Sequence, residues 1–204
     1  MTGARRSGNF AKVTLCEMTL PKGDPMNDGS LPPQYVSGLV DGEGCFVLGF
    51  RRDKRYERKG QPEYFYWNVG FAVLLRSDDH QLLEKVRNTL GCGNVSVSGD
   101  SAQYRVYRIE DLKHKIVPFF AENRIYGKKG KDFVLWAEAV AILYETHLKR
   151  KAVDRKGRWG FPRVRPDAIS NERLLTLKEE METYKASGHA WKWLSNLEEG
   201  SRAD

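Results

Sequence analysis

Between residues 34 and 148, some segments have hydrophobic residues at helical spacing and others have them at strand spacing. Apolar residues recur every three or four positions in four segments, which predicts amphipathic helices at 34–43, 77–90, 111–122 and 131–148. Strict alternation marks 64–76 as a long strand. Shorter strands are predicted at 45–52, 94–98 and 103–109. The predicted order is helix, two strands, helix, two strands, then two helices.

This order predicts an α+β fold, with four antiparallel strands and helices covering one face. The other face is then free for a partner. We divide the chain into three parts. Residues 1–30 form a partly disordered lead-in and 31–148 form the core. Residues 149–204 form a basic arm and a final amphipathic helix at 171–185.

Composition narrows the function classes without choosing one. Lys and Arg number 34 against 27 Asp and Glu, for a net charge of +7, which suits a nucleic-acid partner. Three cysteines without a CxxC pair, and four scattered histidines, argue against disulfides and zinc. They favour a reducing compartment, such as bacterial cytoplasm or an organelle, over secretion. We find no apolar run of the roughly 18 residues that a membrane span needs.

The segment that carries candidate chemistry is Tyr35-Val-Ser-Gly-Leu-Val-Asp-Gly-Glu-Gly-Cys-Phe46. Gly38 and Gly42 lie one helical turn apart, although glycine inside a helix costs roughly 1 kcal/mol relative to alanine. Their pairing suggests a backbone that approaches closely. Glu43 ends the helix, where the dipole is already negative, so a cation would compensate it. An amphipathic helix with an acidic, frayed end is the alternative.

Residues 36–44 resemble the LAGLIDADG motif of homing endonucleases, with Val for the first Leu, Ser for Ala, Gly for the second Ala and Glu for the second Asp. The segment 74–95 also resembles the family's central helix and following strand. The resemblance covers about 34–146 and implies the family's four-stranded DNA-binding saddle. A single motif copy implies a homodimer whose motif helices pack at the two-fold axis. The implied interface residues are Val36, Ser37, Gly38, Val40, Asp41 and Gly42.

The same resemblance implies a metal-dependent cleavage site for double-stranded DNA. Glu43 and the Gly42 carbonyl would hold Mg²⁺, with Mn²⁺ as an alternative and Ca²⁺ binding without supporting cleavage. In Lys129-Gly-Lys-Asp132, Lys129 would compensate transition-state charge, although a solvated loop lysine is the alternative. Asp41 resembles the family's first acidic position, which usually caps and braces the pair of motif helices, so a structural role is expected for it. Two symmetry-related copies would cut a long pseudo-palindromic site.

One position departs from the family pattern. Better-studied members carry a glutamine at the end of the second strand, where this chain has Leu75 followed by Arg76. Either Arg76 substitutes for that glutamine or the water network differs.

The open face of the sheet is expected to lie in the DNA major groove, where base edges are distinguishable. Strand alternation and nearby charge predict a set of DNA-contacting residues. The set is Val47, Gly49, Arg51, Arg52, Lys54, Arg55, Tyr66, Asn68, Gly70, Ala72, Arg76, Ser96, Ser98, Gln103, Arg105 and Tyr107. Asn68 or Gln103 would read adenine, and Arg51 or Arg105 guanine. Arg52, the basic residues of 54–59 and the 149–165 arm would meet phosphates.

Three other functions are compatible with the sequence. The same fold could serve as a maturase that binds intron RNA and has lost cleavage, which Leu75 would favour. It could also be a DNA-binding regulator without catalysis. A basic RNA-binding structural protein outside this family would not dimerise through 34–43.

Overall fold

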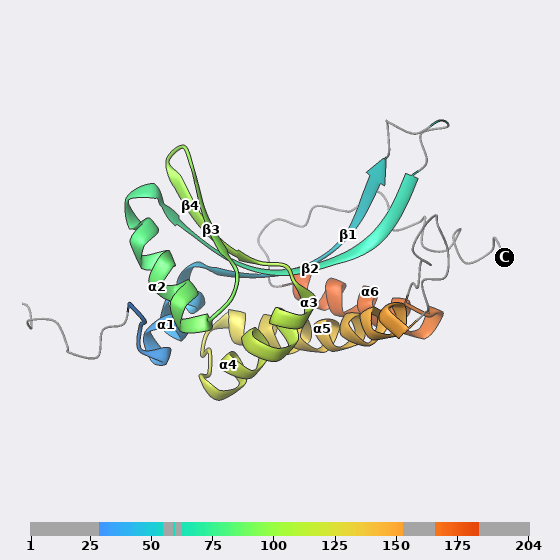
Figure 1. Cartoon of the computed structure of the whole chain (residues 1–204). Helices are drawn as coiled ribbons and strands as arrows, with labels where there is room; N and C mark the ends of the chain where they lie inside the picture. The colour runs from blue at the N-terminus through green and yellow to red at the C-terminus, as the bar shows by residue number, and fades with distance from the viewer. Residues whose placement is uncertain (1–28, 55–58, 60–62, 153–165, 184–204) are drawn as a thin grey trace, which may run out of the picture.

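The computed structural model describes residues 29–54, 59, 63–152 and 166–183. Its centre is one antiparallel sheet in the order β1-β2-β4-β3. The strands are β1 (Gly44–Lys54), β2 (Glu63–Arg76), β3 (Asn94–Ser98) and β4 (Ser101–Val106). The sheet curves strongly, and the helices α4, α5 and α6 lie against its convex side (Figure 1). The predicted α+β architecture with one covered face is therefore confirmed.

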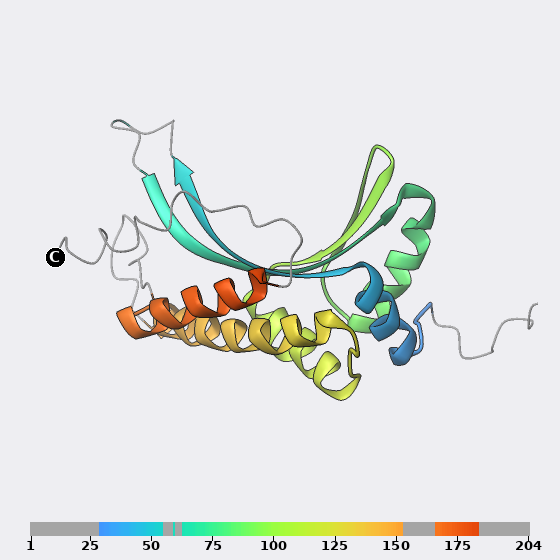
Figure 2. The ribbon, with the colours of Figure 1, turned by 180° about the vertical axis from the view of Figure 1, so that it is seen from behind.

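The helices follow the predicted order and add detail to it. They are α1 (Pro33–Glu43), α2 (His80–Leu90), α3 (Ile109–Asp111), α4 (Val117–Glu122), α5 (Lys128–Ala152) and α6 (Ala168–Glu182). A 3-10 turn at Ser77–Asp79 leads into α2, which ends at Gly91 in the left-handed conformation (φ 64°). Seen from behind, α1 lies beside α2 at one end of the helical layer (Figure 2).

The core lies between the sheet and the helices because alternate strand residues point inward. Phe46 on β1 is the centre of an aromatic cluster, with its ring 5.3 Å from that of Phe71 and 5.0 Å from that of Trp136. Trp136 is fully buried and donates its Nε1–H to the Val47 carbonyl oxygen at 3.2 Å. The helix α5 is thereby fixed across the middle of the covered face.

Several predicted boundaries were wrong. The last strand is Ser101–Val106 and not 103–109. The helix predicted at 111–122 contains a wide π turn at Leu112–Ile116, just before Pro118. Proline has no N–H to donate to the preceding turn, and its ring crowds that turn, so a local widening there is expected. The core boundary placed at residue 148 falls inside α5, which continues to Ala152.

The final helix packs into the same hydrophobic core as the sheet. Its residues Leu174, Leu177 and Met181 are at most 1% exposed. Trp67 on β2 donates its Nε1–H to the Asn171 side-chain oxygen at 2.9 Å. The C-terminal amphipathic helix was thus predicted, with its range shifted from 171–185 to 168–182.

Some sequence-based predictions fall outside the described residues. These are the lead-in up to residue 28, Arg55, Arg58, the arm from 153 to 165, and everything after 183. Among the described helices, none combines the length and the apolar character that crossing a membrane requires.

Candidate functional site

The motif helix α1 divides into a buried side and an exposed side. Val36 and Val40 are 0% exposed and Ser37 is 5% exposed, all within their own chain. Tyr35, Gly38 and Gly42 face outward, with Tyr35 half exposed. The sequence-based choice of Val36, Ser37 and Val40 as contacts to a second copy is therefore wrong, because their surface is already covered.

Packing within the chain does not explain why positions 38 and 42 are glycine. A Cβ atom added at Gly38 or Gly42 would meet nothing within 4 Å. Gly44 is different, since a Cβ there would lie 2.5 Å from the Val40 side chain. The tight turn into β1 explains Gly44, whereas Gly38 and Gly42 leave a smooth, open strip of helix.

Three contacts tie α1 to the loop that precedes α5 and to the first turn of α5. The Ser37 hydroxyl donates to the Asn123 carbonyl oxygen at 2.9 Å. One turn further on, the Asp41 carboxylate accepts the Gly127 backbone N–H at 2.8 Å. The Lys129 ammonium then donates to the Gly42 carbonyl oxygen. The fold therefore brings Lys129 to the end of α1 that carries Glu43, as the predicted site requires.

Glu43 is exposed and, within the described residues, its carboxylate makes no hydrogen bond or ion pair. A carboxylate and a backbone carbonyl are hard oxygen donors, the type that Mg²⁺ and Ca²⁺ prefer. No group of three or more acidic, histidine or cysteine side chains gathers in the part of the chain that is described. The end of α1 therefore presents one exposed carboxylate, Glu43, next to a carbonyl oxygen, that of Gly42, which accepts a hydrogen bond from Lys129.

Leu75 lies in an apolar environment at the end of β2. It shares the inward side of the strand with Phe71 and Val73, and it packs half-buried against the core. Arg76 points the other way and binds the Asp78 carboxylate through two contacts of 3.1 and 3.3 Å. The Arg76 guanidinium is therefore already paired in this structure.

The open face of the sheet carries the residues that alternation predicted for it. The pairing register places Arg51 beside Tyr66, and Gly49 beside Asn68. On the other half of the sheet, Ser96 pairs with Gln103. The ring of Tyr107 lies on the backbone of Gly70, where a Cβ would come within 2.7 Å of it.

Two details of this face were not predicted. Leu74 belongs to it, pairs with Gln103 and is 49% exposed. The two-residue periodicity that places Tyr66 and Ala72 on the open face also places Leu74 there. Arg52 and Lys54 instead lie an even number of residues from Phe46 and Phe50 on β1. They therefore point to the covered side of the sheet, near the hairpin end.

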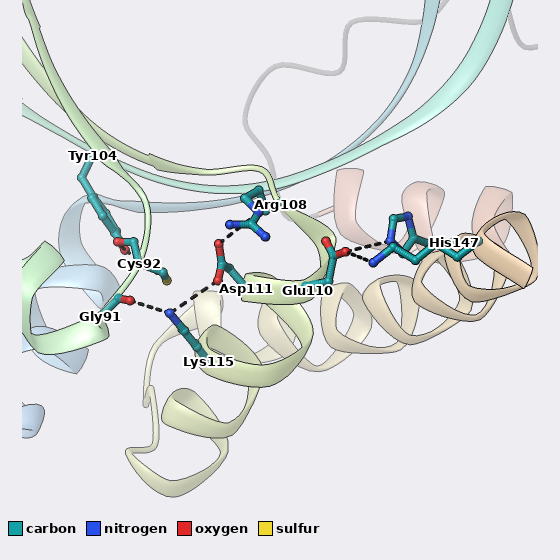
Figure 3. Close-up of polar contacts among 9 residues, drawn as sticks. Gly91, Cys92, Tyr104, Arg108, Glu110, Asp111, Lys115 and His147 are labelled. Carbon is teal, nitrogen blue, oxygen red and sulfur yellow. Dashed lines mark hydrogen bonds and ion pairs between the residues drawn. The ribbon is translucent and has the colours of Figure 1, made fainter. Parts of the chain in front are cut away.

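A second set of charged residues fixes the corner between β4 and the helices (Figure 3). Glu110 accepts hydrogen bonds from Lys151 at 2.6 Å and from His147 at 2.8 Å. Lys151 is the main reason, with His147 contributing, that the pKa of Glu110 falls from 4.5 to about 2. Lys115 donates to the Gly91 carbonyl oxygen at 2.6 Å, and so caps the end of α2.

Beside this corner, Tyr104 and Cys92 are held in the core. The Tyr104 hydroxyl donates to the Cys92 carbonyl oxygen at 2.8 Å. Burial raises the pKa of both the Tyr104 hydroxyl and the Cys92 thiol. These groups stay neutral and serve packing, away from the open sheet face.

The comparisons with known proteins identify the class to which this fold and motif helix belong. The family model for the LAGLIDADG endonuclease matches residues 36–140, just over half of the chain. The chain therefore belongs to the LAGLIDADG endonuclease family.

Curated relatives agree with this assignment. The chain is 30% identical over 127 residues to a probable intron-encoded DNA endonuclease 1 of Mycosarcoma maydis, covering 62% of this chain and 41% of that one. It is 28% identical over 120 residues to a probable intron-encoded endonuclease 2 of Neurospora crassa, covering 56% of this chain and 25% of that protein. The chain thus spans between a quarter and about two-fifths of these relatives.

Solved structures share the fold. The homing endonuclease I-TnaI superposes with a TM-score of 0.57 at 26% identity, over 83% of this chain and 98% of that one. I-SmaMI bound to an uncleaved DNA target in the presence of calcium ions gives a TM-score of 0.61 at 21% identity. That match covers 83% of this chain and 49% of the I-SmaMI chain. The unit described here is therefore the size of one I-TnaI chain and of half an I-SmaMI chain.

Proposed function

We propose that this protein is a site-specific endonuclease that cuts double-stranded DNA by metal-dependent phosphodiester hydrolysis, with two copies of the chain acting together. The observation that carries the proposal is the end of α1. There the Lys129 ammonium donates to the carbonyl oxygen of Gly42, the residue before the exposed Glu43. Membership of the LAGLIDADG endonuclease family supports the same reaction.

Glu43 and the Gly42 carbonyl are the groups that would hold the metal, with the carbonyl oxygen using the lone pair that Lys129 leaves unused. A bound Mg²⁺ supplies Lewis-acid polarisation of the phosphate and an acidified water as nucleophile. Mn²⁺ is expected to replace it, and Ca²⁺ to bind without supporting cleavage. The I-SmaMI structure with uncleaved DNA and calcium ions fits this expectation for that protein.

Lys129 has a separate role from the metal ligands. Its ammonium reaches the Gly42 carbonyl from the first turn of α5. Phosphodiester hydrolysis places extra negative charge on the phosphate oxygens in the transition state. A fixed cation beside them stabilises that charge. Lys129 therefore serves as the electrostatic partner of the Glu43 site.

A homodimer is supported by the open strip on α1. Gly38 and Gly42 have no intrachain reason to be glycine, although each costs roughly 1 kcal/mol in a helix. A second α1 helix packed against this strip supplies the reason, since glycine allows two backbones to approach. The dimer-facing residues would then be Tyr35, Gly38 and Gly42. Such packing would also bring two Glu43 carboxylates close together, which bound cations would stabilise.

The open sheet face is the DNA-reading surface in this proposal. Its exposed side chains include an amide and guanidinium groups that pair with adenine and guanine edges. Gln103 suits this role, because it lies half-buried on this face and pairs with Ser96 in the sheet.

Replacing Glu43 tests the cleavage proposal. Glu43→Gln is expected to abolish Mg²⁺-dependent cutting and to retain DNA affinity, because it removes a metal ligand and leaves the sheet face intact. The measurements are single-turnover cleavage and metal-free binding. The DNA is a duplex selected by binding from a randomised library. Glu145→Gln, an exposed change on α5, is the control. Cutting by the Glu43 variant at the wild-type rate contradicts the assignment.

An intron-RNA maturase on the same fold is a second candidate, favoured by the apolar Leu75 at the end of β2. The relatives carry names that place them in introns. Incubation with the insertion-site DNA and Mg²⁺ separates the two functions. Enhanced intron splicing without DNA cleavage supports the maturase.

DNA binding that needs neither Glu43 nor metal supports a regulator. Each candidate acts in the compartment that holds the host gene, bacterial cytoplasm or an organelle.

A further inference from the structure

The side chain of Asp41 is committed to its own chain. Its carboxylate accepts the Gly127 backbone N–H at 2.8 Å. A side chain at Gly127 would collide with that carboxylate, so the loop backbone lies directly on α1. The family resemblance implies that Asp41 caps and braces the pair of motif helices, whereas the structure shows a contact within one chain.

The contact falls at the start of the helix that carries Lys129. Gly127 immediately precedes α5, whose first N–H groups have no partner within the helix. A carboxylate at a helix N-terminus interacts favourably with those groups and with the helix dipole. Asp41 is therefore well suited to hold this end of the 25-residue helix α5 in place.

The loop is held at its other end by the same face of α1. Ser37, one turn before Asp41, donates to the Asn123 carbonyl oxygen at 2.9 Å. A Cβ at Gly130, in the first turn of α5, would lie 2.5 Å from the Ile125 carbonyl oxygen. The loop and the first turn of α5 are thus closely packed, and they have little freedom to shift independently.

We propose that Asp41 is a positioning residue that, through the Gly127 backbone, fixes the Lys129 ammonium at the Gly42 carbonyl oxygen for DNA cleavage. The inference rests on the cleavage function proposed above. The Asp41 carboxylate accepts the Gly127 N–H, and the proposal assigns it no direct contact with substrate or metal. Its effect on cleavage should therefore pass entirely through Lys129.

A double-mutant cycle isolates that route, because residues that act through one another give non-additive effects. Asp41→Ala should slow single-turnover cleavage about tenfold to a hundredfold, the loss typical of a slightly displaced catalytic group. Asp41→Asn keeps an acceptor oxygen for Gly127 and should recover most of the rate. In a Lys129→Ala background, Asp41→Ala should change the rate less than about twofold. DNA affinity and the sedimentation coefficient should match the wild type throughout.

Each contrary result has a distinct meaning. Independent, multiplying losses from Asp41→Ala and Lys129→Ala overturn the proposal, because Asp41 would then act outside Lys129. A monomeric Asp41→Ala protein also overturns it, in favour of bracing between motif helices. If both Asp41 variants melt at much lower temperature, Asp41 serves only the stability of the fold. Two other results would show that the cleavage function itself is wrong. These are normal DNA cutting by the Glu43→Gln variant and an unchanged cleavage rate in the Lys129→Ala variant.

Discussion

At the residue scale, the Tyr107 ring packs closely against Gly70 on the open sheet face. The Tyr107 ring lies against the strand backbone, and half of the residue remains exposed. Asn68 lies two positions away on the same face, with its unpaired amide donor. A half-exposed aromatic ring suits apolar contact with a thymine methyl group in the proposed DNA complex.

Adding one methyl group at Gly70 tests this arrangement. Gly70→Ala should push the Tyr107 ring aside and alter base preference at one position of the target, with at most about 1 kcal/mol lost in stability because the ring can rotate. Binding to a randomised duplex library, sequenced before and after selection, measures the preference. Val97→Ala, an exposed change on the other side of the sheet, is the control. An unchanged base preference would show that Tyr107 does not contact DNA.

The Glu110 carboxylate makes a pH-dependent contribution to stability. Its pKa is lowered from 4.5 to about 2, mainly by Lys151, so its contribution is complete above pH 4.5 and is lost between pH 4.5 and 2. A pKa shift of this size corresponds to about 3 kcal/mol of folding stability. Solvent screening around the half-exposed Lys151 reduces this contribution to about 1 kcal/mol. Glu110→Gln should therefore cost about 1 kcal/mol at pH 7 and almost nothing near pH 2. Urea unfolding over this range measures it, and a difference independent of pH contradicts it.

At the scale of elements, α6 belongs to the core although its sequence surroundings are basic and polar. Leu174, Leu177 and Met181 are buried against the rest of the helical layer. Arg173 adds a two-pronged ion pair to Glu138 on α5, with contacts of 2.6 and 2.8 Å. The apolar face of α6 provides most of its attachment, since exposed ion pairs contribute little.

Truncating one buried side chain of α6 measures that attachment. Leu177→Ala should lower the free energy of unfolding by about 2–5 kcal/mol, the range for a leucine removed from a packed core. Ile169→Ala on the same helix is the matched control, because Ile169 is 81% exposed and should change little. Chemical denaturation of both variants decides between core packing and a loosely attached arm. Equal losses in the two variants would contradict the packing described here.

At the scale of the whole molecule, the described chain is one half of a two-fold assembly in our proposal. The I-SmaMI chain is about twice the length covered by this fold, whereas I-TnaI is nearly covered by it. The open strip of α1 is the surface on which a second copy would be seated. A second motif-bearing domain could occupy the same strip if the chain were part of a longer protein.

Gly38→Leu tests the assembly. Because a Cβ at Gly38 meets nothing within its own chain, the larger side chain should leave the monomer folded and block helix-to-helix packing. The expected result is a monomer by sedimentation, with an unchanged melting profile at low concentration and no double-strand cleavage. Ala168→Leu, an exposed change at the start of α6, is the control. An intact dimer in the Gly38 variant would move the interface elsewhere.

The sequence by itself determined the order of elements, the inward and outward sides of the strands, and the motif helix that ends in Glu43. These follow from local periodicity and short-range chemistry, which a single segment carries. Only the tertiary structure decided that Val36, Ser37 and Val40 face inward, and that Asp41 binds Gly127. It also decided how α6 joins the core. Those features depend on contacts between residues as many as 104 positions apart, and no local pattern records them.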